Sequence, residues 1–468
     1  MTSASVFSLK HYLVACVFSL ASWDVHADNV SFYGKRNIVV EDEAALNPVE
    51  FHRRAIAPAF IEEAVDVDVD VDADVVTSNE NLPILATAQA PEQHIYTLTR
   101  NEKLLAKKAQ YYVEQNRRPE TGLWDSVSGY AHTTMWDVAS GIAATLALEA
   151  LEMKTSEATL YELSKTIQSL HHLPLYNNQL PNREYSTKTG QPSGRLSETE
   201  SNGNGWSALD IGRLLIWLDI LRKAHPSLEH PIEQLVKGWD LKRAVNNNTL
   251  YGAKLYKGKE YYRQEGRYGY LQYAIKGFQL FGYNVDVSEA EEHIRSVIIN
   301  NIEVKRDTRN VPFFTSDPYI LSALEFGQDP QWNQLDSIYQ LHKNYWDANQ
   351  ALISFGEDAM DKNPWFAYNN IYYYKKPWTS VSSSGKPIEN PQQFSHKIAY
   401  GFSVLYDDAF SEALALTVIE GNRPFRSIST GIYEDGGSNT AFNINTNSLI
   451  LVSMWYQVLG KRPILTRY

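Results

Sequence analysis

Carboxylate side chains recur beside glycine, proline and aromatic residues in several short stretches of this sequence. Glu265 lies in QEGR, Glu357 in SFGEDAM and Glu434 in IYEDGGS. Two carboxyl groups that face one cleft can break a glycosidic bond, because one protonates the leaving oxygen while the other activates water or stabilises the sugar cation. The faces of Trp and Tyr rings offer apolar surfaces against which sugar rings can pack. These residue types indicate chemistry on a saccharide.

Other polar and aromatic side chains collect at expected helix starts and in the loops that lead into them. Aspartate at a helix start also suits a helix cap, and Glu265 between Arg263 and Arg267 also suits a structural ion pair. Asp358 and Asp361 are interpreted as solvated loop charges. No metal or other cofactor is expected. The candidate substrate-binding residues are Trp136, Asp137, Asp210, Arg267, Tyr268, Asp317, Tyr319, Trp365, Tyr368 and Asn445.

The stretch 431–460 is unusually rich in Asn and Thr just before an apolar helical segment. Asn443, Asn445 and Asn447 are expected to fix the loop that carries Glu434 and the helix that follows, or to bind sugar hydroxyls. Short polar side chains that bond to nearby backbone groups suit both tasks.

Two kinds of helical segment alternate along the chain and must position these residues. Segments of the first kind are apolar nearly all round, as in helices buried on every side. They span 133–151, 207–223, 267–282, 316–327, 395–408 and 445–460. Segments of the second kind are amphipathic and charged, and span 101–117, 156–173, 230–244, 288–302, 331–344 and 408–420.

An inner ring of six helices inside an outer ring of six satisfies this alternation, so the sequence predicts an all-α (α/α)6 toroid. A stack of helical repeats is the competing arrangement, but the segments have no fixed period. The toroid places the outer-to-inner connections at one rim, beside the N-termini of the inner helices. The long outer-to-inner connections are 117–133, 174–206, 245–266, 345–394 and 421–444. A small β-hairpin is expected near 365–390.

The N-terminal region differs from the rest of the chain. Residues 1–27 have the layout of a cleaved secretory signal, with a basic start, an apolar stretch and a small-residue cleavage site. The single cysteine, Cys16, lies inside it; LVAC also resembles a lipoprotein box, the less favoured interpretation. Residues 28–90, which include the run VDVDVDVDAD, are interpreted as a largely disordered acidic spacer before a toroid domain at 91–468. A periplasmic or secreted bacterial protein is expected.

The formal net charge is −12 at pH 7. This balance argues against nucleic acid or an anionic membrane as partner. No apolar run approaches the roughly 20 residues that span a bilayer, so no membrane span is expected after signal cleavage.

Several blocks in order resemble a bacterial family catalogued as domain of unknown function 3131, related to the glucoamylase-like toroid hydrolases. They include TTMWDVAS, LPLYNNQLPNREYSTKTG, GWSALDIGRLL, QEGRYGYLQYAIKGFQLFGY, DPYILSALEFG, GEDAMDKNPWFAYN, FSHKIAYGF and GIYEDGGSN, followed by NTNSLILVSMWY. The resemblance covers about 95–465, and the chain departs from the family pattern at Leu271. It implies secretion or membrane anchoring and a link to exopolysaccharide or β-glucan metabolism.

The related toroids place the general acid before the third inner helix and the base before the sixth. Carried onto this sequence, the resemblance implies Glu265 as acid and Glu434 as base, with Glu357 in reserve for either role. The leading hypothesis is a glycoside hydrolase that acts on a bacterial polysaccharide or β-glucan, and inversion of the anomeric centre is the expected mechanism. The alternatives are a non-catalytic polysaccharide-binding or exopolysaccharide assembly protein, and a polysaccharide lyase that recruits Tyr268, Arg267 and His396.

Overall fold

The structure is a computed structural model that describes residues 96–193, 201–286, 291–309, 314–382 and 384–468. The predicted signal and acidic spacer lie outside the described residues. Within them, no helix combines the length and apolar character needed to cross a membrane.

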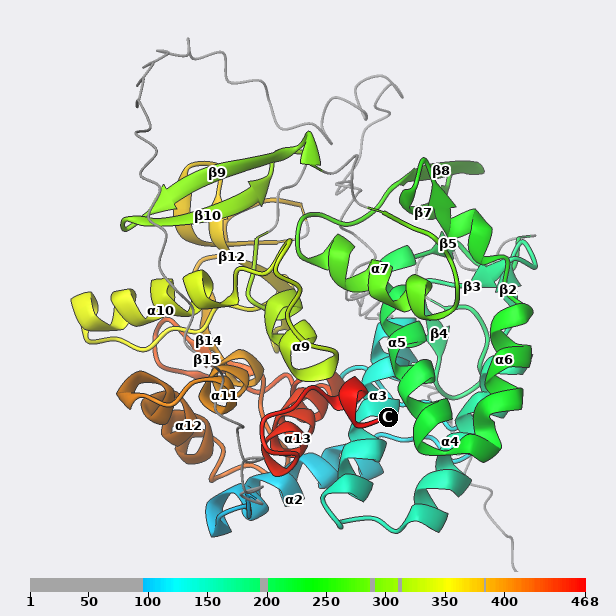
Figure 1. Cartoon of the computed structure of the whole chain (residues 1–468), viewed down its shortest axis with the longest axis horizontal. Helices are drawn as coiled ribbons and strands as arrows, with labels where there is room; N and C mark the ends of the chain where they lie inside the picture. Colours follow the sequence, from blue (N-terminus) through cyan, green and yellow to red (C-terminus); the bar gives the residue numbers. More distant parts are fainter. Residues whose placement is uncertain (1–95, 194–200, 287–290, 310–313, 383) are drawn as a thin grey trace, which may run out of the picture.

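Six helices of the described chain form a closed ring. Each packs against the next, from α3 through α5, α7, α9 and α11 to α13, and α13 packs against α3 again. All six predicted inner segments therefore form the expected helices, and the (α/α)6 toroid is confirmed (Figure 1). The inner helices are α3 Met135–Ala150, α5 Ala208–Ala224, α7 Tyr270–Leu280, α9 Asp317–Glu325, α11 His396–Leu405 and α13 Ile444–Val458.

Small residues let neighbouring inner helices approach closely. A Cβ atom on Gly277 of α7 would lie 1.9 Å from the carbonyl oxygen of Gly212 on α5, and one on Gly212 would lie 2.5 Å from the carbonyl oxygen of Ala274. The backbones of α5 and α7 thus touch where larger side chains would hold them apart.

Outer helices lie where the amphipathic segments predict them, with one exception. Those of the described residues are α2 Arg100–Gln115, α4 Ser156–His172, α6 Glu229–Lys237, α10 Leu335–Asn349 and α12 Ala409–Gly421.

The exception is the predicted helix at 288–302, which is wrong over the part that the structure describes. Strands β9 Ile294–Ile299 and β10 Ile302–Asp307 form an antiparallel hairpin there. Asn300 and Asn301 connect them with φ of 47° and 63°, the left-handed pair that a two-residue hairpin turn requires. The β-branched Ile and Val residues on either side of this turn favour strands.

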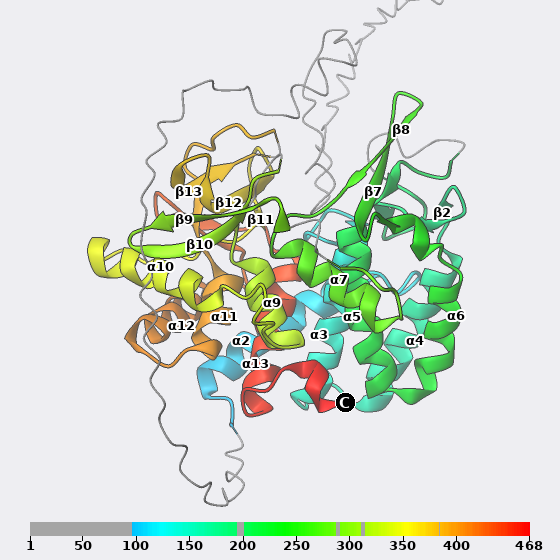
Figure 2. The same cartoon turned by 45° about the horizontal axis from the view of Figure 1, so that its top comes forward.

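The long connections meet at one end of the helix ring, as predicted. There they pair with one another: β1 with β4, β5 with β7, and β14 with β15, while Val127 bridges to Asn443. Figure 2 shows the hairpins grouped at this end. The hairpin expected near 365–390 is confirmed by β12 and β13.

The remaining elements of the described chain are short. The strands, including those of the rim, are β1 His132–Thr133, β2 Leu175–Tyr176, β3 Leu180–Pro181, β4 Tyr185–Ser186, β5 Gly205–Trp206, β6 Val245–Asn246, β7 Thr249–Tyr256, β8 Lys259–Gln264, β11 Asp358–Ala359, β12 Phe366–Tyr373, β13 Lys376–Val381, β14 Gln392–Ser395, β15 Gly431–Tyr433 and β16 Ser438–Asn439. The 3-10 turns are η1 Pro226–Leu228, η2 Leu241–Ala244 and η3 Ile464–Arg467.

Candidate functional site

The N-termini of α3 and α5 hold two buried aspartates at the rim. The backbone N–H and the hydroxyl of Thr134 donate to Asp137 Oδ2 over 3.0 and 2.9 Å. The hydroxyl of Ser207 donates to Asp210 Oδ1 over 3.0 Å. Both aspartates therefore belong to helix caps, as their sequence positions suggested. The caps also fix where the two carboxyl groups point.

Glu265 follows β8 and is fully buried beside the start of α5. Its Oε2 accepts the N–H of Ala208 over 2.6 Å, and its Oε1 lies 3.5 Å from Arg183 Nη2. A Cβ on Gly252 would come within 2.5 Å of Oε2, so this glycine makes room for the carboxylate. The ion-pair interpretation of Glu265 is thus supported, with Arg183 as the partner.

Asp210 stands next to Glu265 in a different electrostatic situation. Burial raises the pKa of Asp210 well above its ordinary value, and the charge of Glu265 raises it further, while Arg183 lowers it. No donor among the described residues reaches its buried Oδ2 atom. Burial and the charge of a neighbouring carboxyl group thus both favour the protonated form of Asp210.

Asn445 connects the last inner helix to the first. Its Nδ2 donates to Asp137 Oδ1 over 2.8 Å, and its Oδ1 accepts the Ser140 hydroxyl over 2.7 Å. Burial raises the pKa of Asp137, an effect opposed by the hydrogen bonds from Asn445 and Thr134. The flanking asparagines hold the backbone: Asn443 caps α13, and Asn447 Oδ1 accepts the N–H of Ile428. The Asn-rich stretch therefore does fix this helix, as predicted.

An arginine lies beneath this network, inside the helix ring. The Arg213 guanidinium forms a 2.9 Å ion pair with Glu325 and lies 4.7 Å from the centre of the Trp136 ring. Trp136 in turn contacts Tyr270, with 5.9 Å between ring centres. The aromatic contact links the α3 side of the rim to the α7 side.

Glu357 lies on that second side, and three residues hold it. The Tyr270 hydroxyl donates to Glu357 Oε2 over 3.1 Å. Asp317 Oδ2 accepts the backbone N–H of Glu357 over 2.9 Å, and Lys397 Nζ donates to its carbonyl oxygen. Side chain and backbone of this fully buried glutamate are thus both held.

Lys397 is also the cation of a buried cluster. It lies 2.8 Å from Asp317 and 3.2 Å from Asp358. Burial raises the pKa of Asp358 to about 6, against the lowering effect of Lys397. The interpretation of Asp358 as a solvated loop charge is therefore wrong, since its side chain is fully buried. Asp361, in contrast, is exposed as expected.

The structure brings four predicted acidic residues into one connected set, the rim carboxylates: Glu265, Asp210, Asp137 and Glu357. The first three interact electrostatically, and the contact of Trp136 with Tyr270 leads to the fourth. Among the described residues, no group of His, Cys, Asp and Glu is arranged to bind a metal ion.

Glu434 lies apart from this set. It is exposed in the turn between β15 and β16, where Gln393 Nε2 donates to its carboxylate over 2.8 Å. Glu265 and Glu434 have no hydrogen-bonding partner in common among the described residues.

The remaining candidate binding residues differ widely in exposure. Tyr319 and Tyr368 are buried, and Tyr268 is nearly so. Arg267 is partly buried and donates to Gln264, and Trp365, 39% exposed, stands at the rim before β12.

Sequence reasoning missed three basic residues of the site, Lys397, Arg213 and Arg183. Lys397 and Arg213 lie inside apolar helical segments, where a cation must be paired to be buried. That rule alone could have marked both as members of a buried polar cluster. The contacts of Arg183 and Tyr270 could not be predicted from their local sequence, because their partners are distant in the chain.

The fold and this rim define the class of the molecule: an (α/α)6 toroid with buried carboxylates and aromatic side chains at the N-termini of its inner helices. The chain belongs to the DUF3131 family, described as proteins of unknown function, whose family model matches residues 104–460. No curated protein sequence matches the chain significantly.

Solved structures of similar fold come from several bacteria. A candidate glucoamylase from Bacteroides fragilis NCTC 9343 shares 14% identity at a TM-score of 0.57, over 81% of this chain and 97% of that chain. The endo-β-1,2-glucanase of Chitinophaga pinensis, bound to sophorotriose and glucose, shares 13% at 0.58, over 79% and 97%. The β-1,2-glucanase of Parabacteroides distasonis shares 12% at 0.54, over 80% and 60%. At these identities the likeness establishes the fold.

Proposed function

We propose that this protein is a secreted or periplasmic glycoside hydrolase that cleaves a glucan by carboxylate acid and base catalysis. The observation that carries the proposal is the set of rim carboxylates, held by helix caps and ion pairs beside Trp136 and Tyr270. Glycosidic cleavage needs one protonated and one ionised carboxyl group in one site. The similar folds named as glucanases support a glucan as substrate.

Asp210 is the proposed general acid. Burial and the charge of Glu265 raise its pKa well above the ordinary value, which favours the protonated form, and its Oδ2 has no donor among the described residues. A general acid must hold its proton until the leaving oxygen takes it.

Glu357 is the proposed base. The Tyr270 hydroxyl donates to its Oε2 atom, a contact that fixes the position of the carboxyl group. A water held by this carboxylate would attack the sugar carbon from the face opposite the acid, which inverts the anomeric centre.

The pair implied by the family resemblance, Glu265 and Glu434, receives less support from the geometry. Glu265 is committed to Arg183 and the N–H of Ala208, and Glu434 is exposed on a separate hairpin. In this proposal Glu265 keeps Asp210 protonated, and Glu434 lies at the outer edge of the rim.

The rim carboxylates are buried, so a polysaccharide reaches them only when the segments that cover the rim move aside. Long loops on a rigid scaffold are suited to such movement, and lids of this kind exclude water during the reaction.

The lyase alternative receives little support from the contacts of His396. Burial lowers the pKa of His396 to about 4, and its Nδ1 contacts the backbone of Ser429 and the side chain of Asn422. The imidazole is thus neutral and held in the protein interior. It shares no hydrogen-bonding partner with Tyr268 or Arg267 among the contacts described.

Product analysis tests the proposal. The purified protein is incubated with β-1,2-, β-1,3- and β-1,6-glucans and bacterial exopolysaccharides. We expect new reducing ends from a glucan, with the inverted anomer first in a proton NMR time course. An unsaturated product that absorbs in the ultraviolet would indicate a lyase. Binding without any product would indicate a non-catalytic polysaccharide-binding protein.

A further inference from the structure

A cavity of about 700 Å³ lies beside α7, and none of the four rim carboxylates lines it. Its walls are α7, the β9–β10 hairpin and the segment that follows α9. Its lining includes Tyr268, Gln272, Ser296, Phe326, Asp329 and Trp332.

The cavity follows from the departure of the chain from a regular outer ring. A helix at this position would pack its side chains directly against the outward face of α7. The β9–β10 hairpin lies there instead, and its Ser296 side faces the cavity. On the other side of the hairpin, Arg306 contacts the ring of Tyr372 on β12. The hairpin is thus braced against the rim while it leaves a space beside α7.

Gln272 presents a fixed hydrogen-bond donor to this space. Its side chain is 6% exposed, and its Oε1 accepts the N–H of Gly269 over 2.8 Å. That bond sets the orientation of the amide, so Nε2 is the amide atom that can donate to a ligand in the cavity. No acceptor among the described residues takes a hydrogen bond from it. The amide of Gln272 lines the cavity, where a ligand or water can accept a hydrogen bond from Nε2.

Tyr268 adds a second polar group. It is 5% exposed, and its hydroxyl has no hydrogen-bonding partner among the described residues. Burial raises the pKa of Tyr268 to about 12, with further contributions from the charges of Asp329 and Glu291. The phenol therefore stays protonated beside two carboxylates of the same cavity.

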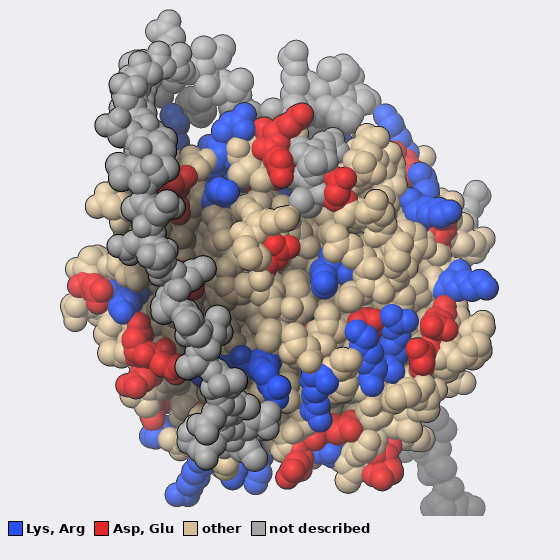
Figure 3. Space-filling model, in the orientation of Figure 1, with Lys and Arg blue, Asp and Glu red and all other residues tan. Residues whose placement is uncertain are grey.

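Aromatic surfaces complete the lining. Trp332 is nearly buried and fixed against Tyr319, with 5.7 Å between ring centres, and Phe326 is partly exposed. Acidic and basic side chains are mixed on the face drawn in Figure 3 rather than gathered by sign. An uncharged ligand rich in hydroxyl groups fits this combination of aromatic faces, amides and scattered carboxylates.

We infer that this lateral cavity is a second carbohydrate-binding site, separate from the rim, that holds a neutral oligosaccharide. Gln272 Nε2 donates to a sugar hydroxyl, the carboxylate of Asp329 accepts from one, and the rings of Trp332 and Phe326 pack against sugar C–H faces. The site binds saccharide without cleaving it, and it would keep a long glucan attached to the protein.

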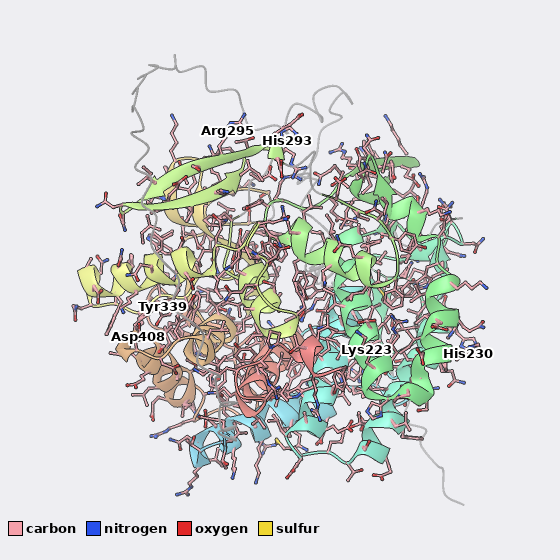
Figure 4. The ribbon with its side chains drawn as sticks, in the orientation of Figure 1. Lys223, His230, His293, Arg295, Tyr339 and Asp408 are labelled. Carbon is pink, nitrogen blue, oxygen red and sulfur yellow. The ribbon has the colours of Figure 1, made fainter. Side chains whose placement is uncertain are left out.

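Hydrogen exchange with sophorotriose as probe tests the inference on the full chain. We expect the probe to slow exchange in the segment 326–332 and along α7. Ser296→Trp fills the cavity from an exposed strand position and should abolish that protection. Arg295→Trp, on the opposite side of the same strand, is the matched control and should keep it (Figure 4 labels Arg295 on β9).

A second variant probes the donor itself. Gln272→Glu keeps an acceptor for the N–H of Gly269 but removes the NH₂ group, so we expect weaker protection from an intact fold. Unchanged protection in Ser296→Trp, or no protection in wild type at millimolar sophorotriose, would overturn the inference.

The outcome is separable from the proposed hydrolysis. Glu357→Gln should lose cleavage yet keep the protection of 326–332, whereas Ser296→Trp should lose the protection yet still cleave a short glucan. Protection without cleavage in wild type would leave the lateral site standing and remove the hydrolase.

Discussion

Lys397 is the cation that pairs with the two buried carboxylates, Asp317 and Asp358, beside Glu357. Burial lowers the pKa of Lys397, but the charges of Asp317 and Asp358 raise it above its ordinary value. The ammonium group therefore stays charged. We expect Lys397→Met to lower the free energy of unfolding by roughly 3–5 kcal/mol, because two buried carboxylates are left without their cation. Urea unfolding measures the loss.

Lys343 provides the control for this prediction. It pairs with Asp408 over 2.8 Å at the partly exposed contact between α10 and α12, where Figure 4 labels Tyr339 and Asp408. Lys343→Met should cost no more than about 1 kcal/mol, as for other surface pairs. Equal losses in the two variants would contradict the buried cluster.

Asp358 gives the stability of the protein a predictable dependence on pH. Its pKa is about 6 in the folded chain and 3.8 in the ordinary case, so the folded state binds the proton more tightly. Its contribution to stability therefore falls as the pH rises from about 4 to about 6. The midpoint of urea unfolding should therefore decrease less over this pH range for Asp358→Asn than for wild type. A steeper decrease in the variant would contradict the assigned shift.

At the scale of residues, chemical type was easier to predict than environment. Asp137 and Asp210 were recognisable as members of helix-capping arrangements, with Thr134 and Ser207 as the caps, because capping needs only local sequence. Asp358 was misjudged because its burial depends on Lys397, which lies 39 positions further along the chain. The contacts of Glu265 with Arg183 and Ala208 are of the same long-range kind.

At the scale of elements, a substitution can test the close packing of α5 against α7. Gly277→Ala would place a methyl group against the backbone of Gly212, so we expect a loss of about 1–3 kcal/mol. Gly421→Ala, at the end of α12, meets its nearest atom at 3.4 Å and should be neutral or slightly stabilising. Thermal unfolding compares the two, and equal melting temperatures would contradict the close approach.

Periodicity identified the helices but failed at one outer element. The inner segments are apolar nearly all round, a pattern that only buried helices of this length share. The segment 288–302 has charged residues at helical spacing in its first half and β-branched residues in its second. Asn300 and Asn301 form the turn that makes this segment a hairpin. The charged residues at helical spacing drew attention away from this pair.

At the scale of the whole molecule, closure of the helix ring was predictable from the alternation of buried and amphipathic segments. The number and order of segments is enough to propose a toroid, because each inner helix must be covered on its outer side. The lateral cavity was not predictable, since it depends on the element that does not follow the alternation.

Export is the prediction that concerns the entire chain. The sequence predicts cleavage after Ala27, so N-terminal sequencing of the protein from a bacterial periplasmic fraction should begin at Asp28. A mature chain that begins at Cys16 with a lipid attached would contradict this and support the lipoprotein interpretation.

The rate of glucan cleavage by carboxylate variants tests the central claim most directly. Reducing-end release is measured for wild type, Asp210→Asn, Glu357→Gln and the control Glu420→Gln, which alters an exposed carboxylate on α12. We predict a loss of roughly 100-fold or more in the first two variants and a wild-type rate in the control. Wild-type rates in both rim variants, with cleavage lost instead in Glu434→Gln, would contradict catalysis by the buried rim.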